Sequence, residues 1–197
     1  MGAPGASISS LPGGSMSKDT AILIETSQVH KKNRIVIGIA ILAFGLLFAF
    51  SVYKWVVVGV QQPIEVFFNL MFIYVLIERA QAKYICEIGK KTIRITKKSL
   101  LGSKTYEVDY KDIDGIYKYK TGLVHVVKFR RTYRLNSALD NRLVWAMAYE
   151  APGKGGKVEN HRIFFKASDE LLNLLDEKMP NRVRLTEEQV ALKILKK

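Results

Sequence analysis

The 197-residue sequence has little cysteine and little histidine: Cys86 is the single cysteine, and the three histidines are His30, His125 and His161. One cysteine excludes an internal disulfide framework and a cysteine-rich zinc module. The histidines are far apart in the sequence and lack the spacing of metal ligands. No serine, cysteine or aspartate stands in the context of a known nucleophile. We therefore expect no metal, no cofactor and no catalytic site, and predict that the protein is not an enzyme.

Charge is absent from part of the chain. The whole sequence has 31 Lys and Arg against 18 Asp and Glu, a net charge of +13, and 48% of its residues are hydrophobic. Residues 35–53 contain no charged side chain, whereas residues 83–197 contain 25 basic and 14 acidic side chains, a net +11. Charge and apolarity thus occupy different segments. This separation predicts a membrane segment followed by a basic folded domain.

The first 15 residues also lack charge and are rich in Gly, Ser, Ala and Pro without hydrophobic periodicity. They precede Met16, and we interpret them as vector sequence ahead of a native start. N-myristoylation at Gly2 is a poor alternative, because Ala6 stands where that modification requires Ser or Thr. Residues 16–34 are polar and mixed in charge, and we expect them to be a cytoplasmic lead-in.

Two membrane helices are predicted within residues 35–83, at about 35–55 and 63–82. The uncharged 19-residue run would measure about 28 Å as a helix, close to the hydrocarbon thickness of a bilayer. The second segment contains Glu65 and Asn69, but its ten Ile, Leu, Val and Phe residues contribute about −4 kcal/mol to insertion. We expect a transmembrane hairpin. The alternative is one span followed by a re-entrant or surface-lying segment.

Basic residues predict the orientation of this hairpin. Five of them flank its open end, whereas Lys54 is the one basic residue in or beside the connection between the helices. By the positive-inside rule, both termini face the cytoplasm, and the protein is a multi-pass protein of the cell membrane. The five flanking residues are Lys31, Lys32, Arg34, Arg79 and Lys83.

Three residues of the predicted helices indicate helix–helix contact. Gly45 and Ala49 form a small-xxx-small pair, which suits close approach of the second helix or of another membrane protein. Asn69 predicts an interhelical hydrogen bond worth about 0.6 kcal/mol. A transporter is excluded, because the sequence has no repeat, broken helix or buried charge cluster.

After Lys83 the pattern becomes alternating, which predicts strands, and residues 84–180 are expected to form one domain. Ser168 then caps a helix with an apolar face, which Pro180 ends. Residues 181–197 form a basic tail with a short helix expected from Thr186. The seven predicted strands are residues 84–88, 92–96, 104–110, 115–119, 123–133, 142–150 and 162–167.

Residues 92–120 resemble the bacterial pleckstrin-homology (PH) domain family. In that family an I-x-I-T strand precedes a turn with Leu and Gly, a strand ending in Tyr, and a D-I step into the next strand. Here these elements are residues 93–96, 101–102, Tyr110 and 112–113. The resemblance implies an α+β fold, a seven-stranded antiparallel β-barrel or sandwich capped by a C-terminal helix, tethered by a preceding helix pair. It says little about activity.

Lysine clusters are the sequence feature with most functional weight. Each Lys or Arg held near an anionic leaflet contributes about 1 kcal/mol of attraction, so the clusters predict contact with anionic phospholipid. The alternative is that the charge only orients the domain. Nucleic acid is disfavoured, because no stacking aromatics or recognition helix accompany the charge. The predicted lipid contacts, in or beside the first two turns of the domain, are Lys90, Lys91, Lys97, Lys98 and Lys104.

Two functional hypotheses follow. The first is a non-enzymatic binding or scaffold module, in which a helix pair anchors a PH-like domain that binds a protein partner or anionic lipid. The second is an accessory or assembly subunit of a larger membrane complex, in which Gly45, Ala49 and Asn69 face the helices of another protein or of a second copy.

Overall fold

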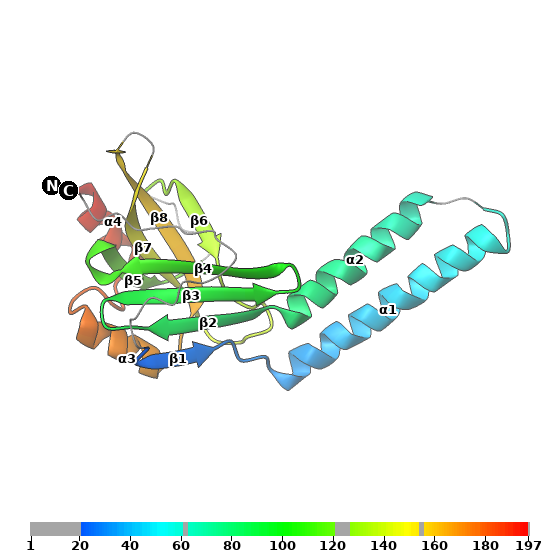
Figure 1. The fold of residues 1–197 in the computed structure, drawn as a ribbon, viewed down its shortest axis with the longest axis horizontal. Helices are drawn as coiled ribbons and strands as arrows, with labels where there is room; N and C mark the ends of the chain where they lie inside the picture. The colour runs from blue at the N-terminus through cyan, green and yellow to red at the C-terminus, as the bar shows by residue number, and fades with distance from the viewer. Residues whose placement is uncertain (1–20, 61–62, 121–126, 154–155, 197) are drawn as a thin grey trace.

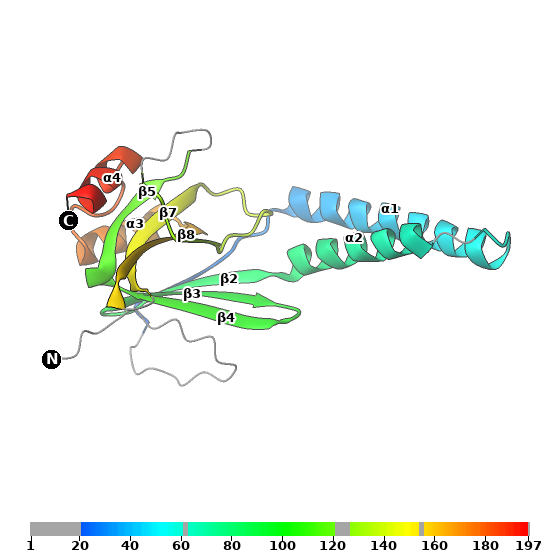
Figure 2. The same ribbon diagram turned by 90° about the horizontal axis from the view of Figure 1, so that it is seen from above.

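The computed structural model describes residues 21–60, 63–120, 127–153 and 156–196. A pair of helices projects from one end of a domain built of two sheets and two further α-helices (Figures 1 and 2). The predicted vector sequence, residues 1–15, lies outside the described residues. So do residues 16–20 of the predicted lead-in and 121–126, which include part of a predicted strand.

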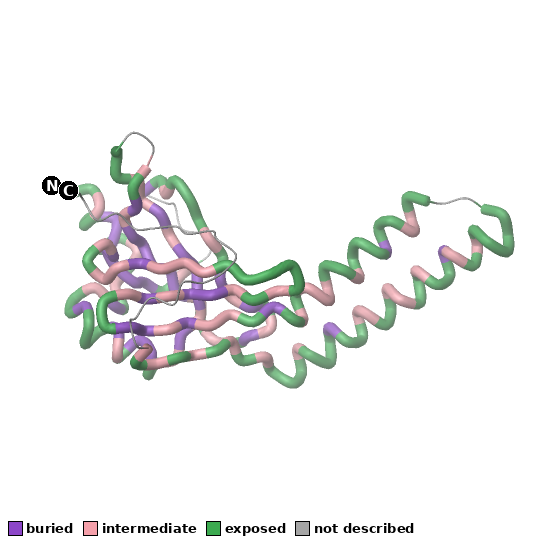
Figure 3. Tube along the Cα trace, viewed as in Figure 1, coloured by how far each residue is buried: buried purple, intermediate pink, exposed green. Residues whose placement is uncertain are grey.

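Helices α1 (Lys31–Val56) and α2 (Pro63–Gln81) run side by side in opposite directions. Within the described residues, α1 is the only helix long and apolar enough, by length and composition, to cross a membrane. Just 6% of its most apolar stretch is buried, so α1 is not a core helix (Figure 3). Helix α2 has 19 residues and carries Glu65, Glu78 and Arg79.

The first sheet has the strand order β1-β2-β3-β4, and every pair in it is antiparallel. Its edge strand β1 lies in the segment predicted to be a lead-in, and this strand was missed. Leu23 packs against the core, and Glu25 on the same face reaches an ion-pair network described below. The four strands are β1 (Leu23–Thr26), β2 (Lys83–Ile88), β3 (Thr92–Ser99) and β4 (Gly102–Asp109).

The second sheet has the order β5-β7-β8-β6, and β6 pairs with β8 in parallel. The described residues form eight strands, and one pairing is parallel. The prediction of seven antiparallel strands is therefore wrong in number and in one pairing. Residues 135–143 form a long anchored loop after β6 rather than a tight hairpin, so β8 lies between β6 and β7. The strands are β5 (Ile113–Lys118), β6 (Arg131–Arg134), β7 (Val144–Pro152) and β8 (Val158–Lys166).

The core lies between the two sheets, and α3 (Asp169–Lys178) packs against it through Leu171, Leu172 and Leu175. The Ser168 hydroxyl caps α3 by accepting from the backbone N–H of Leu171 at 3.2 Å. A short helix, η1 (Tyr110–Asp112), joins the two sheets, and α4 (Glu187–Leu195) packs against β5. The predicted α+β class is thus confirmed.

Candidate functional site

Four lysines lie at the end of the first sheet that adjoins the base of the helix pair (Figure 1). Lys83 of β2 is paired with Lys98 of β3, and Lys97 of β3 is paired with Lys104 of β4. We call these four residues the lysine rim. Because side chains alternate along a strand, Lys83 and Lys98 lie on one face of the sheet and Lys97 and Lys104 on the other. Both faces of this sheet end are therefore positively charged.

One ion pair connects the lysine rim to α2. The Lys97 ammonium donates a hydrogen bond to the Glu78 carboxylate in the last turn of α2, with a nitrogen–oxygen distance of 3.0 Å. This hydrogen bond is the main cause that raises the pKa of Lys97. The other three rim lysines are exposed. Directly opposed like charges destabilise a strand pair, so a cluster of exposed lysines on paired strands favours an anionic partner.

Lys90 and Lys91 lie at the opposite end of the same sheet, in the turn between β2 and β3. The six residues of β2 separate this turn from the lysine rim by about 20 Å, at about 3.3 Å per residue. The structure therefore brings Lys97, Lys98 and Lys104 together, adds Lys83, and places Lys90 and Lys91 elsewhere.

The turn between β3 and β4 presents two exposed leucines beside the lysine rim. Leu100 is 51% exposed and Leu101 is 82% exposed. Ser99 pairs with Gly102 across this two-residue turn, and Gly102 has φ +126°, a conformation that favours glycine. In the sequence, Leu101 was interpreted only as part of a family turn. Two apolar residues inside a turn flanked by lysines were the signal that was overlooked.

A chain of polar contacts joins the helices at the end far from the domain. Asn69 of α2 is buried and donates to the Ser51 hydroxyl of α1 at 3.2 Å. Ser51 donates to the Glu65 carboxylate at 2.6 Å, and Lys54 forms an ion pair with Glu65 at 3.1 Å. Ser51 was not identified from the sequence, because a single serine in an apolar helix has many explanations.

Gly45 and Ala49, the other predicted helix contacts, do not face α2. A Cβ placed on Gly45 would meet no atom within 4 Å, and Ala49 is exposed. The contact between the helices instead includes the stacked rings of Phe44 and Phe72, whose centroids are 5.2 Å apart. The small-residue pair is thus left on the outer surface of α1.

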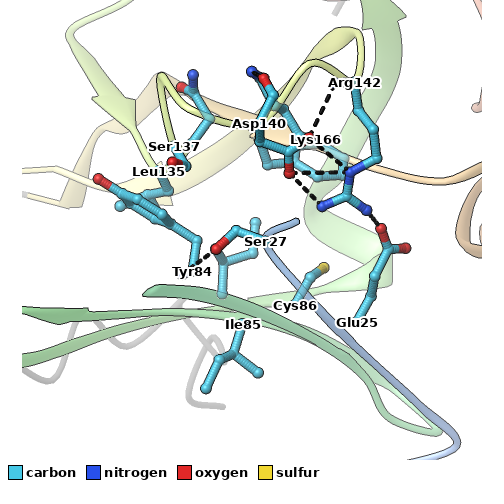
Figure 4. A pocket seen from close by; sticks show the side chains of 13 residues that line it. Glu25, Ser27, Tyr84, Ile85, Cys86, Leu135, Ser137, Asp140, Arg142 and Lys166 are labelled. Carbon is cyan, nitrogen blue, oxygen red and sulfur yellow. Dashed lines mark hydrogen bonds and ion pairs between the residues drawn. The ribbon is translucent and has the colours of Figure 1, made fainter. Parts of the chain in front are cut away.

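A partly buried ion-pair network holds β1 to the rest of the domain (Figure 4). The Arg142 guanidinium contacts Glu25 of β1 and donates to the Asp140 carboxylate at 2.6 Å. Glu25 accepts from the backbone N–H and the hydroxyl of Ser168, at 3.1 and 2.7 Å. Lys166 donates to the carbonyl of Asp140. Burial lowers the pKa of both Arg142 and Lys166, and the charge of Asp140 opposes this shift at Lys166.

This network lines a small, solvent-open depression together with the Cys86 side chain. Burial raises the pKa of Cys86 to about 12, so its thiol is neutral and poorly nucleophilic at physiological pH.

The three histidines lie in different parts of the chain: His30 caps α1, His161 is buried, and His125 lies outside the described residues. Among the side chains that the structure describes, no group of three or more His, Cys, Asp or Glu residues could hold a metal ion.

Comparison with protein-family models, with curated proteins and with solved structures found no match for this chain. The resemblance of residues 92–120 to bacterial PH domains therefore stays a hypothesis carried by those residues. The function is inferred from the arrangement of the chain's own side chains.

Proposed function

We propose that this protein is a membrane-anchored, PH-like binding module whose lysine rim contacts the anionic headgroups of the cytoplasmic leaflet. It acts by binding and not by catalysis. The observation that carries the proposal is the position of the lysine rim at the base of an apolar helix pair. Charge and anchor lie at the same end of the domain, so insertion of the helices brings the lysines to the bilayer surface.

The exposure of α1 supports a membrane location. A helix that is apolar on all sides is normally buried in a protein core or in lipid, and α1 is not buried in this protein. Its 26 residues span about 39 Å, enough to cross the hydrocarbon. Helix α2 crosses beside it in our proposal. The bonds from Ser51 and Lys54 to Glu65 satisfy the polar group that most opposes insertion of α2.

The first sheet supports a hairpin whose two ends lie on one side of the bilayer. Thr26 of β1, just before α1, is paired with Ile85 of β2, just after α2. The start of α1 and the end of α2 are therefore held together by strand pairing. Basic residues surround this end of the helix pair, whereas Lys54 lies at the other end. The positive-inside rule then places the domain in the cytoplasm.

The magnitude of the attraction follows from the exposed lysines. At about 1 kcal/mol each, Lys83, Lys98 and Lys104 contribute about 3 kcal/mol of attraction to an anionic leaflet. Lys97 contributes less, because Glu78 already neutralises it. The turn with Lys90 and Lys91 lies about 20 Å farther away, well beyond the Debye length of about 8 Å at physiological ionic strength. Of the lysines predicted from the sequence, we therefore assign lipid contact to those of the rim and not to Lys90 and Lys91.

The fold supports the PH-like part of the proposal at the level of architecture. Two packed sheets enclose the core, and α3 covers part of it. The domain departs from a simple seven-stranded PH fold in two ways: β1 precedes the helix pair, and β6 is parallel to β8. Such a fold hosts many functions, so the lipid assignment rests on the lysine rim and not on the fold.

The test compares two double variants of the full chain in nanodiscs of phosphatidylcholine, with or without phosphatidylglycerol. Lys98→Glu with Lys104→Glu changes the lysine rim, and Lys90→Glu with Lys91→Glu is the matched control at the other end of the sheet. We expect anionic lipid to slow hydrogen exchange in the β3–β4 turn of the wild type and the control, but not of the rim variant. High salt should abolish the effect. Equal exchange of the wild-type turn in both lipids at low salt would overturn the lipid assignment.

A second candidate function is the accessory subunit of a larger membrane complex. The observation that favours it is the outward position of Gly45 and Ala49, where another helix can approach closely. Purification in mild detergent distinguishes the two functions. A stoichiometric membrane protein that is lost in a Gly45→Leu variant supports the accessory role, and a monomer that purifies alone opposes it.

A further inference from the structure

The β3–β4 turn is an apolar projection in a strongly basic part of the surface. Leu101 is 82% exposed and its neighbour Leu100 is 51% exposed. The flanking lysines Lys98 and Lys104 are also exposed. A solvated turn is usually polar, whereas this one exposes two leucines, and neither belongs to the hydrophobic clusters that the described residues form.

The turn lies beside the last turn of α2 (Figures 1 and 2). Lys97 fixes this position, because its ammonium contacts Glu78 of α2. Leu100 and Leu101 are three and four residues farther along the hairpin, which extends past the start of β2 at Lys83. At about 3.3 Å per residue, the leucines reach about 10 Å beyond the Cα of Lys97. They therefore lie at the level where the apolar part of α2 ends and its polar end begins.

We infer that Leu100 and Leu101 insert into the headgroup–acyl boundary of the leaflet that the lysine rim contacts, an inference that rests on the proposed function. The bilayer is the partner that fits both features. Its acyl boundary accepts leucine side chains, and its anionic headgroups pair with the lysines on either side. The long alkyl stems of those lysines let their charges stay at headgroup level while the leucines lie deeper.

The turn gives the domain a contact with the bilayer that is separate from the helix pair. Helices α1 and α2 lie side by side and join the domain at one common base. The β3–β4 turn lies to one side of that base, so its insertion fixes which face of the domain is turned to the membrane. The opposite face then remains open to a cytoplasmic partner.

A fluorescence experiment on the full chain tests this inference. A cysteine at Leu101 is labelled with an environment-sensitive nitrobenzoxadiazole probe, and the protein is placed in anionic nanodiscs that contain doxyl-labelled lipid. The buried Cys86 makes the unsubstituted chain the labelling blank. Two matched sites complete the set. Leu42, 65% exposed on α1, is the positive control, and Val158, 66% exposed at the β7–β8 turn far from the helices, is the negative control.

We expect the doxyl lipid to quench most of the emission at Leu101 and at Leu42, and to leave the emission at Val158 unchanged. Quenching at Leu42 without quenching at Leu101 would refute the insertion of the turn, leave the membrane anchor intact, and direct attention to a protein partner for the leucines. Absence of quenching at Leu42 would refute the membrane anchor and the insertion together. Leu101 is so exposed that its substitution should not disturb folding, and a second label at Leu100 repeats the measurement independently.

Discussion

Replacing Arg142 by methionine should weaken the attachment of β1 to the rest of the domain. Arg142 joins the carboxylates of Glu25 and Asp140, and these side chains are 18%, 12% and 1% exposed respectively. Methionine keeps most of the apolar stem but removes the charge and every guanidinium hydrogen bond. Two carboxylates then remain close together in a partly buried site without their shared cation, and this uncompensated charge destabilises the folded state.

The expected loss is about 3 kcal/mol of unfolding free energy. Removing one partner of a buried ion pair costs about 3–5 kcal/mol. The lower end of this range applies here, because both carboxylates still accept other hydrogen bonds. Asp140 accepts from the backbone N–H groups of Gln28 and residue 142, and Glu25 accepts from the backbone N–H and the hydroxyl of Ser168. For a chain of this size, about 2–4 °C per kcal/mol gives a fall in melting temperature of about 6–12 °C.

Thermal unfolding of the full chain in detergent, followed by tryptophan fluorescence, measures this loss, because Trp145 is buried in the domain. Arg142→Lys keeps the charge without the planar fork and should give an intermediate fall. Arg130→Met is the matched control. Its side chain is 72% exposed and its guanidinium lies 3.8 Å from the Glu159 carboxylate, so its loss should change stability by less than about 1 kcal/mol.

Hydrogen exchange locates the effect within the chain. Arg142→Met should accelerate exchange of the β1 amides more than those of β7, because β1 is an edge strand held by this network. If Arg142→Met melts within 2 °C of the wild type, or if β1 exchanges no faster, the network is not what holds the segment before α1 to the domain.

Two further predictions concern the core and the packing of α4. Burial raises the pKa of Cys86 to about 12 from its ordinary value of 9.0, so the folded chain should resist thiol reagents and react fully once unfolded. The free energy of unfolding should also fall as the pH rises from 9.0 toward 12, because the thiol of the unfolded chain loses its proton first. Fast alkylation of the native chain would contradict this. Gly115→Ala should cost about 1–3 kcal/mol, because the new Cβ would lie 2.8 Å from a Val190 methyl and 2.9 Å from a Leu185 methyl. Adding Val190→Ala should relieve part of that strain in thermal unfolding, and an unchanged melting temperature in Gly115→Ala would show that α4 does not pack closely on β5.

The helix pair and the α+β class were predictable because each depends on a local pattern. An uncharged run of 19 residues and an alternating pattern after Lys83 can each be recognised within a short window. Strand β1 was not predictable in this way. It has four residues, and the hydrogen bond that follows it joins Ser27 to Tyr84 of β2, which lies 57 residues farther along the chain. Only the folded arrangement of the helix pair brings these strands together.

The division of the five predicted lysines follows from topology. Successive turns of an antiparallel sheet lie at alternate ends, so Lys90 and Lys91 could not share a surface with the β3–β4 turn. Strand lengths alone would have shown this. Lys83 was assigned to the end of a helix, and its place in the lysine rim became evident only from its pairing with Lys98. The Arg142 network joins three distant segments, and no local pattern marks it.

Labelling from each side of the membrane tests the central claim, that α1 and α2 span a bilayer as a hairpin with the domain on the cytoplasmic side. Cysteines at Val58, beyond the far end of α1, and at Val158, in the domain, are both at exposed positions. A membrane-impermeant maleimide should label residue 58 only in right-side-out vesicles and residue 158 only in inside-out vesicles. Labelling of both positions from the same side would contradict the hairpin, and with it the placement of the lysine rim against the inner leaflet.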